Sequence, residues 1–215
     1  VNPSSILRQC LLGCATTRYN DRPQDAQRPF DADRDGCVCS EGAATLIVES
    51  AEHAARRGAD VLARIVGHGS SCATTPPNVV ETNGAAIGRA IRFALRDAHL
   101  EPGDIDVVVA HGVAVPAQDV AEATAIAQTL GDVPVTCFSG GMGNVGAAHG
   151  AVDGALACQM LRANKAPPIR NCERRDPRCP IRVVTGSALE KPLRRVMVLS
   201  AAIAGQAAAL ILEKP

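Results

Sequence analysis

A histidine at the end of a buried strand is the first residue whose type and position could support chemistry. The apolar run 107–110 (Val-Val-Val-Ala) is typical of a strand buried on both faces of a parallel sheet. It ends at His111-Gly112, and Pro116 and Asp119 then predict the start of a helix. Open α/β sheets bind ligands where the carboxyl end of a strand passes into a helix, so His111 is a candidate site residue. A polar residue that only caps the loop would give the same pattern.

The elements that would position His111 alternate along the chain after residue 84. Helices are predicted over 84–100, 119–130 and 145–163, and strands over 107–110, 133–138, 182–186, 195–201 and 207–213. Before residue 84 we expect a helix over 4–14, a strand over 37–49, a helix over 49–58, a strand over 61–67 and a loop over 68–83. This order predicts an α/β fold in which helices separate parallel strands and the last strands are antiparallel.

Composition excludes several classes of function. Acidic and basic residues balance at 22 each, so there is no electrostatic footprint for nucleic acid or an anionic membrane. Aromatic residues make up only 2% of the chain, which argues against base stacking. The nine cysteines lack the paired spacing of a zinc ribbon, so we expect no metal site. We find no signal peptide or transmembrane segment and expect a protein of the reducing cytoplasm.

Four motifs carry a resemblance to a known family. They are RPFDADRDG at 28–36 with EGA at 41–43, AHG at 110–112 followed by Pro116, Asp119 and Glu122, SGGMGN at 139–144 with Gly150, and AGQAAALIL at 204–212. Together they resemble the signatures of the β-ketoacyl synthase (condensing enzyme) family of the thiolase fold. The resemblance covers essentially the whole chain.

The resemblance implies an α/β, thiolase-like architecture and corresponds to the C-terminal half of the family. A thiolase fold consists of two repeats. We expect residues 1–67 to end the N-terminal repeat and residues 68–215 to form the C-terminal repeat with a mixed five-stranded sheet. Nothing here corresponds to the rest of the N-terminal half, so we expect a truncated sequence or one chain of a split protein. Such a chain would expose a sheet edge and an apolar face.

The resemblance also implies a catalytic pocket, and this sequence departs from it. In the family, a cysteine carries the acyl chain while two histidines hold the malonyl thioester as carbon dioxide leaves. Here His111 corresponds to the first histidine, Asn144 replaces the second, and Ser139 replaces a lysine. The acid that faces this lysine corresponds to Asp153. Losing one donor to a developing enolate costs about 10²–10³ in rate. His149 stands where the family has alanine, and we do not expect it to replace the second histidine.

Four residues are candidates for contact with the acyl chain. Val113 and Val115 replace two threonines of the turn after the first histidine, and Gln206 lies in the closing motif. Ile203 falls where the family has a phenylalanine that gates the acyl pocket, although simple core packing would explain it equally well. The family nucleophile lies in the N-terminal half, and none of the nine cysteines occupies an equivalent strand-to-helix elbow.

The departures favour a chain-length-factor-like subunit (ketosynthase β). Such a subunit pairs with an active ketosynthase, shapes the acyl pocket and lacks condensing activity itself. A second reading is an active 3-oxoacyl synthase that uses Asn144 as its second donor, because an asparagine amide can donate to a thioester oxygen. A third is a degenerate, non-catalytic scaffold. The expected partners are an active ketosynthase subunit and an acyl carrier protein, and no cofactor is expected, because the carrier delivers the acyl groups.

Overall fold

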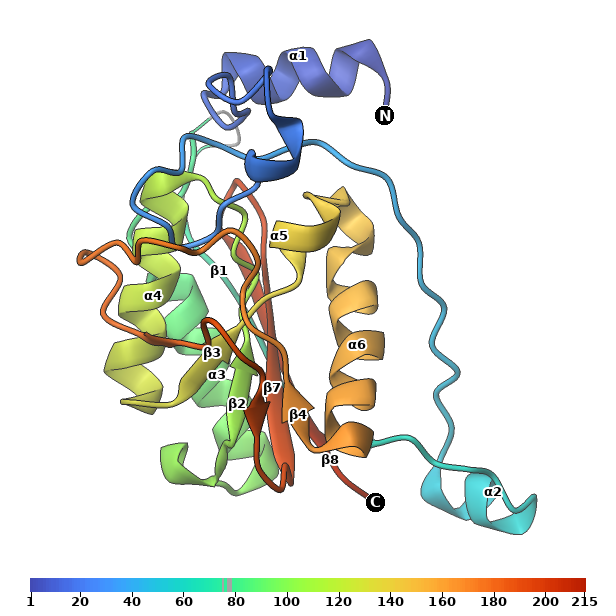
Figure 1. Ribbon diagram of the computed structural model, residues 1–215. Coiled ribbons are helices and arrows are strands. Elements are labelled where there is room, and N and C mark those ends of the chain that lie inside the picture. Colours follow the sequence, from blue (N-terminus) through green and yellow to red (C-terminus); the bar gives the residue numbers. More distant parts are fainter. Residues whose placement is uncertain (75, 77–78) are drawn as a thin grey trace.

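One mixed sheet organises the molecule. The computed structural model describes residues 1–74, 76 and 79–215. Six strands form this sheet in the order β1-β8-β7-β2-β3-β5 (Figure 1). They are β1 (Arg64–Cys72), β2 (Val107–Val109), β3 (Pro134–Thr136), β5 (Arg182–Val183), β7 (Arg195–Ala201) and β8 (Gln206–Glu213). Two short strands, β4 (Lys165–Ala166) and β6 (Leu189–Glu190), form a separate pair that the sequence did not reveal.

Strand directions match the sequence prediction. β2 runs parallel to β3 and β7, and β3 runs parallel to β5. β8 is antiparallel to both β7 and β1. The predicted α/β fold with a mixed sheet is therefore confirmed. The sheet has six strands rather than five, because β1 joins it along the free side of β8.

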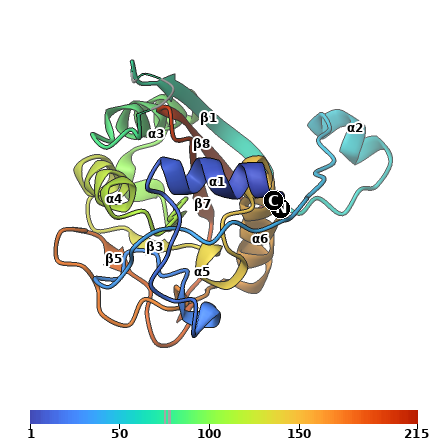
Figure 2. The same ribbon diagram turned by 90° about the horizontal axis from the view of Figure 1, so that it is seen from above.

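Helices cover both faces of the sheet. Figures 1 and 2 show α3 (Ala85–Ala98) and α4 (Pro116–Leu130) on one face and α6 (His149–Ala163) on the other. The remaining helical segments are α1 (Pro3–Leu11), α2 (Ala51–Arg56), α5 (Ser139–Met142) and the 3₁₀ turns η1 (Pro23–Asp25), η2 (Pro102–Asp104) and η3 (Gly146–Ala148). No helix among the described residues is both long and apolar enough to cross a membrane.

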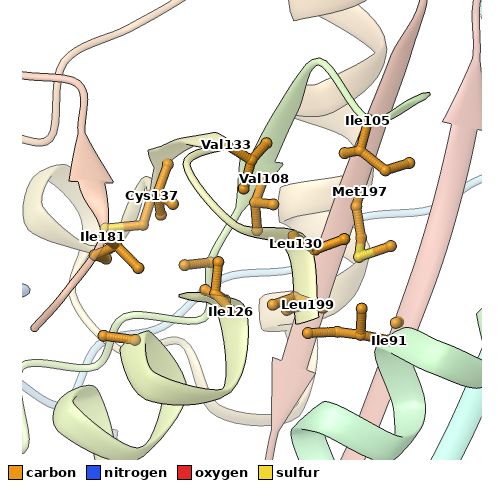
Figure 3. Close-up of a cluster of buried hydrophobic side chains, with 14 of the residues drawn as sticks. Ile91, Ile105, Val108, Ile126, Leu130, Val133, Cys137, Ile181, Met197 and Leu199 are labelled. Carbon is orange, nitrogen blue, oxygen red and sulfur yellow. The ribbon is translucent and has the colours of Figure 1, made fainter. Parts of the chain in front are cut away.

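The side chains of β2 divide the core into two clusters. Val108 packs with Ile91, Ile126 and Met197 on the face covered by α3 and α4 (Figure 3). Val107 and Val109 point the opposite way, into the cluster that includes residues of α6. Successive side chains of a strand alternate between faces, so an unbroken run of valines suits a strand that is buried on both sides.

The segment 41–63 differs most from the prediction. The expected strand over 37–49 is not formed, and residues 41–50 have no assigned secondary structure. Ile47 is 80% exposed and Val48 69% exposed. Figures 1 and 2 show this segment and α2 away from the sheet. A strand needs a neighbour to satisfy its backbone and cover its apolar side chains, and in the described part of the chain this segment pairs with none.

The start of the sheet also needs a correction. We expected a strand over 61–67 belonging to the N-terminal repeat and a loop from residue 68. Instead β1 continues to Cys72 and pairs with β8, so the boundary expected between residues 67 and 68 falls inside one strand. Gly67 permits close packing here, because an added Cβ would lie 2.5 Å from the carbonyl oxygen of Ala94 in α3. The glycine and serine content of this stretch concealed the strand.

Candidate active site

Two acids of α4 hold the turn that carries His111. The carboxylate of Glu122 accepts the backbone N–H groups of His111 at 2.8 Å and of Gly112 at 2.9 Å. Asp119 accepts the N–H of Ala114 at 3.1 Å. Gly112 and Ala114 have positive φ values of 47° and 64°, so this turn forms no regular backbone ladder. The two side chains supply the acceptors that buried N–H groups require.

A buried arginine ties the segment 28–36 to the same helix. Arg34 Nε lies 3.2 Å from Asp119 Oδ2, and both side chains are only 1% exposed. Arg34 Nη1 lies 2.8 Å from Asp176 Oδ2, and Asp119 also accepts the N–H of Phe30 at 2.9 Å. Burial raises the pKa of Asp119 to about 6, although the charge of Arg34 opposes that rise. These contacts give Asp119 a structural role near the start of α4.

Asn144 bridges to the segment 37–40. Its backbone N–H donates to the backbone carbonyl of Val38 at 2.8 Å, and its own carbonyl accepts the N–H of Ser40 at 2.9 Å. In the side chain, Oδ1 accepts the N–H of Gly146 at 3.0 Å, and Nδ2 points to Cys37 Sγ at 3.9 Å. Because sulfur is a weak acceptor, Nδ2 remains able to donate to a ligand.

One open cavity brings together most of the predicted site residues. It has a volume of about 990 Å³, and both His111 and Asn144 line it. The four residues predicted to contact an acyl chain also line it: Val113, Val115, Ile203 and Gln206. Side chains from α1, β1 and the β7–β8 turn complete the walls. The imidazole and the amide therefore face one shared space, and their roles toward a substrate remain predictions.

Ser139 is the one predicted site residue that does not line the cavity. It is fully buried at the start of α5, and its hydroxyl donates to the backbone carbonyl of Gly112. Cys137 Sγ lies 3.8 Å from the same hydroxyl. Ser139 thus supports the His111 turn at the carbonyl of Gly112, whose N–H Glu122 accepts. The residues of the SGGM sequence form the short helix α5, and a catalytic role for Ser139 stays a prediction.

The environment of His111 keeps its imidazole neutral. Burial, with a smaller contribution from the neighbouring His149, lowers the pKa of His111 to about 3. A neutral imidazole has one N–H donor and one lone pair. Nδ1 is buried and has no hydrogen-bond partner among the residues that the structure describes, which leaves Nε2 to meet a ligand in the cavity. An imidazole N–H and the amide N–H of Asn144 are both suited to donate to a carbonyl oxygen that gains charge.

Three thiols line the same cavity, and two of them, Cys14 and Cys37, are not activated. Burial raises the pKa of Cys37 to about 12 and also raises the pKa of Cys14. The thiolate is the reactive form of cysteine, so these thiols are weak nucleophiles at neutral pH. Among the residues that the structure describes, no group of three or more His, Cys, Asp or Glu side chains is arranged to hold a metal ion.

The sequence analysis missed the close approach of His149 to His111. The two ring centroids are 4.6 Å apart with an interplanar angle of 54°. His149 is 1% exposed and begins α6, one turn before Asp153. The i, i+4 spacing of His149 and Asp153 was a signal for that pair. No pattern in the sequence connected His149 with His111.

Comparisons with known proteins identify a family and relatives of this chain. Residues 62–173 match the family described as beta-ketoacyl synthase, C-terminal domain. The chain is 36% identical over 206 residues to a putative polyketide beta-ketoacyl synthase 1 of Streptomyces cyaneus, covering 94% of this chain and 49% of that protein.

Two solved structures share the fold over the whole chain. The ishigamide ketosynthase/chain length factor has a TM-score of 0.91 and 34% identity, over 100% of this chain and 52% of that one. A type II polyketide synthase acyl-carrier protein in complex with its ketosynthase has a TM-score of 0.93 and 28% identity, over 100% and 54%. The chain spans about half the length of these relatives. The family match covers residues 62–173, which include the turn of His111 and the two acids that hold it. This chain therefore belongs to the β-ketoacyl synthase family.

Proposed function

We propose that this protein is a chain-length-factor-like subunit of a type II fatty acid or polyketide β-ketoacyl synthase. In this role it shapes the acyl pocket of a heterodimer with an active ketosynthase and has no condensing activity itself. The observation that carries the proposal is the composition of the cavity. It presents one imidazole, that of His111, beside the amide of Asn144, and the hydroxyl of Ser139 is directed away to Gly112.

The apolar wall of the cavity supports this role. Val113 and Val115 are 5% and 6% exposed, and Ile203 packs against the cluster that they form with Cys14 and Cys37. An apolar pocket with few polar groups suits an acyl chain, and side-chain volume along it limits chain length. A solved relative described as a ketosynthase/chain length factor has the same fold at 34% identity.

The proposed partners follow from the same relatives. One structural neighbour is an acyl-carrier protein in complex with its ketosynthase. We propose that an acyl carrier protein delivers the acyl groups here as well, and that an active ketosynthase subunit supplies the nucleophile. The weakly acidic thiols Cys14 and Cys37 are consistent with a nucleophile that comes from elsewhere.

A second candidate is an active synthase in which Asn144 serves as the second donor. One observation favours it: among the described residues, Nδ2 of Asn144 contacts the weak acceptor Cys37 Sγ at 3.9 Å, so Nδ2 can donate to a thioester oxygen. The condensing nucleophile would then lie outside the residues present here.

One assay separates the two candidates. The natural protein that contains this chain, purified with all of its residues, is incubated with acyl and malonyl groups on acyl carrier protein, alone and together with an active ketosynthase, and the condensed product is measured. The chain-length-factor proposal predicts no product from the protein alone, both for the natural sequence and for Asn144→His. Condensation by either protein alone would overturn the proposal.

An asparagine variant tests the alternative directly. Asn144→Asp keeps the shape of the side chain but replaces the N–H donor with an acceptor, so an active synthase should lose about 10²–10³ in rate. Asn20→Asp is the matched control, because Asn20 is exposed and does not line the cavity. If the protein alone is active and only Asn144→Asp reduces the rate, the second candidate is correct.

A further inference from the structure

His149 and Asp153 form an isolated polar pair inside the protein. Their side chains are 1% and 0% exposed, and Nε2 of His149 lies 3.5 Å from Oδ2 of Asp153. Within the described residues, neither ring nitrogen of His149 and neither carboxylate oxygen of Asp153 has a hydrogen-bond partner. Buried polar groups are normally satisfied, so four unpaired atoms at one place need an explanation.

A proton on the acid accounts for this pair. An unpaired carboxylate in a dry interior is strongly disfavoured, and a buried acid takes up a proton or finds a cation instead. In the part of the chain that the structure describes, no lysine or arginine forms an ion pair with Asp153, and His149 is its only charge partner. A proton on Asp153 beside a neutral His149 leaves both groups without charge.

The groups around the pair favour a proton on the acid. Burial raises the pKa of Asp153 to about 8, and the charge of Glu122 on α4 adds to the rise. Burial lowers the pKa of His149 to about 4, and the positive end of the α6 dipole also disfavours an imidazolium at this position. The other groups nearby are the imidazole of His111 and the thiol of Cys137, whose pKa burial raises well above its ordinary value.

The His149 ring also contacts a residue of the cavity. Its centroid lies 4.6 Å from that of His111, and the rings are tilted by 54°. His149 itself does not line the cavity, whereas His111 does. A positive charge on His149 would lower the pKa of His111, so the protonation of one ring affects the other. His149 can therefore act on a ligand only through His111.

We propose that His149 is a positioning residue for His111: Asp153 carries a proton and leaves His149 neutral beside it, and the His149 ring, in contact with His111, adds to the burial that keeps the imidazole of His111 neutral beside the cavity. His149 is thus not a second donor to the ligand. The proposal concerns the proton balance of the site and stands whether or not the protein condenses acyl groups.

Nuclear magnetic resonance of the histidine rings tests this proposal in the purified protein. The chain has only five histidines, and three of them, His53, His68 and His99, are exposed. With ¹⁵N-labelled rings, we expect His111 and His149 to remain neutral from pH 8 to about pH 5. In His149→Gln, the His111 midpoint should rise by about one pH unit, because a titrating neighbour has been removed.

Asp153→Asn tests the role of the acid in the pair. The amide cannot supply an acidic proton, so the ¹⁵N shifts of His149 should change although the side-chain shape is kept. Asp97→Asn is the matched control, because Asp97 Oδ2 lies 3.0 Å from His68 Nδ1 at the surface, and only His68 should respond.

Two results would overturn the proposal. One is an identical His111 midpoint in the natural protein and His149→Gln. The other is an unchanged set of His149 signals in Asp153→Asn. If His149→Gln fails to fold, the Asp153→Asn result decides alone, because it leaves both imidazoles in place.

Discussion

The backbone N–H of His111 donates a 2.8 Å hydrogen bond to the carboxylate of Glu122, eleven residues further along the chain. The second oxygen of the same carboxylate accepts the backbone N–H of Gly112. One side chain of α4 therefore fixes the exit of β2 and the direction of the imidazole. Because the carboxylate is 3% exposed, it carries this role in a dry environment, and burial raises the pKa of Glu122 to about 7.

Glu122 should make stability depend on pH. Its pKa in the folded protein, about 7, lies above its ordinary value of 4.5, so the folded state binds this proton more tightly than the unfolded state. The resulting stabilisation is complete below about pH 4.5 and is lost as the pH rises through about 7. In Glu122→Gln, the fall in free energy of unfolding across this range should become shallower. Urea denaturation at several pH values measures it.

The comparison must separate Glu122 from other buried acids. Asp119 and Asp153 also have raised pKa values, about 6 and about 8, so only the difference between the variant and the natural protein is informative. Glu190→Gln is a control, because Glu190 is exposed and pairs with Lys165 at the surface. Identical pH profiles for the natural protein and Glu122→Gln would contradict the assignment.

The buried arginine should be essential for stability. In Arg34→Met, the carboxylates of Asp119 and Asp176 lose their common cation while staying 1% and 2% exposed. Removing one partner of a buried ion network costs about 3–5 kcal/mol. Arg174→Met is the control, because Arg174 is 68% exposed and pairs with Asp33 at the surface, where ion pairs contribute little. Equal losses in the two variants, measured by chemical denaturation, would show that the network is not important.

Much of the fold after residue 84 could be predicted from the sequence. The helix expected over 84–100 is α3, and the strand expected over 107–110 is β2, because periodic apolar residues there face a core that both elements build. The helix expected over 119–130 begins slightly earlier, at Pro116. The periodic apolar residues of these elements indicate well which of their sides face the core.

Other parts depend on partners that local patterns do not reveal. The second half of β1 consists mainly of glycine and serine and is a strand because α3 packs closely on it and β8 pairs with it. Residues 43–48 have the pattern of a strand but lie exposed. His111 follows β2 and His149 begins α6, so their contact joins residues far apart in the sequence. No spacing in the sequence indicated it.

The close packing of β1 on α3 gives a steric prediction. A Cβ added at Gly69 would collide with the carbonyl oxygen of Ala90 in α3. Backbone atoms cannot move aside easily, so Gly69→Ala should lower the free energy of unfolding by about 1–3 kcal/mol. Gly103→Ala is the control, because nothing lies within 4 Å of its added Cβ. If thermal and urea unfolding are the same for both variants, β1 does not pack on α3 in this way.

Ile203 provides the prediction that most directly links the cavity to the proposed role. Its half-buried side chain lines the cavity and packs against the cluster around Val113 and Val115. Ile203→Phe adds volume and narrows the space, whereas Ile203→Ala enlarges it. When the protein is paired with an active ketosynthase, products should shorten with phenylalanine and lengthen with alanine, each by about one extension unit.

Mass spectrometry of the released products measures this change. Val79→Phe is the control, because Val79 is 46% exposed and does not line the cavity, so an added ring there should leave product length unchanged. Unfolding measurements on all three variants exclude a loss of fold as the cause of a change. If phenylalanine and alanine at position 203 give the same products as isoleucine, Ile203 belongs to the core alone. The wall that limits chain length must then be formed by other residues, with Val113 and Val115 the next to vary because they line the same cavity.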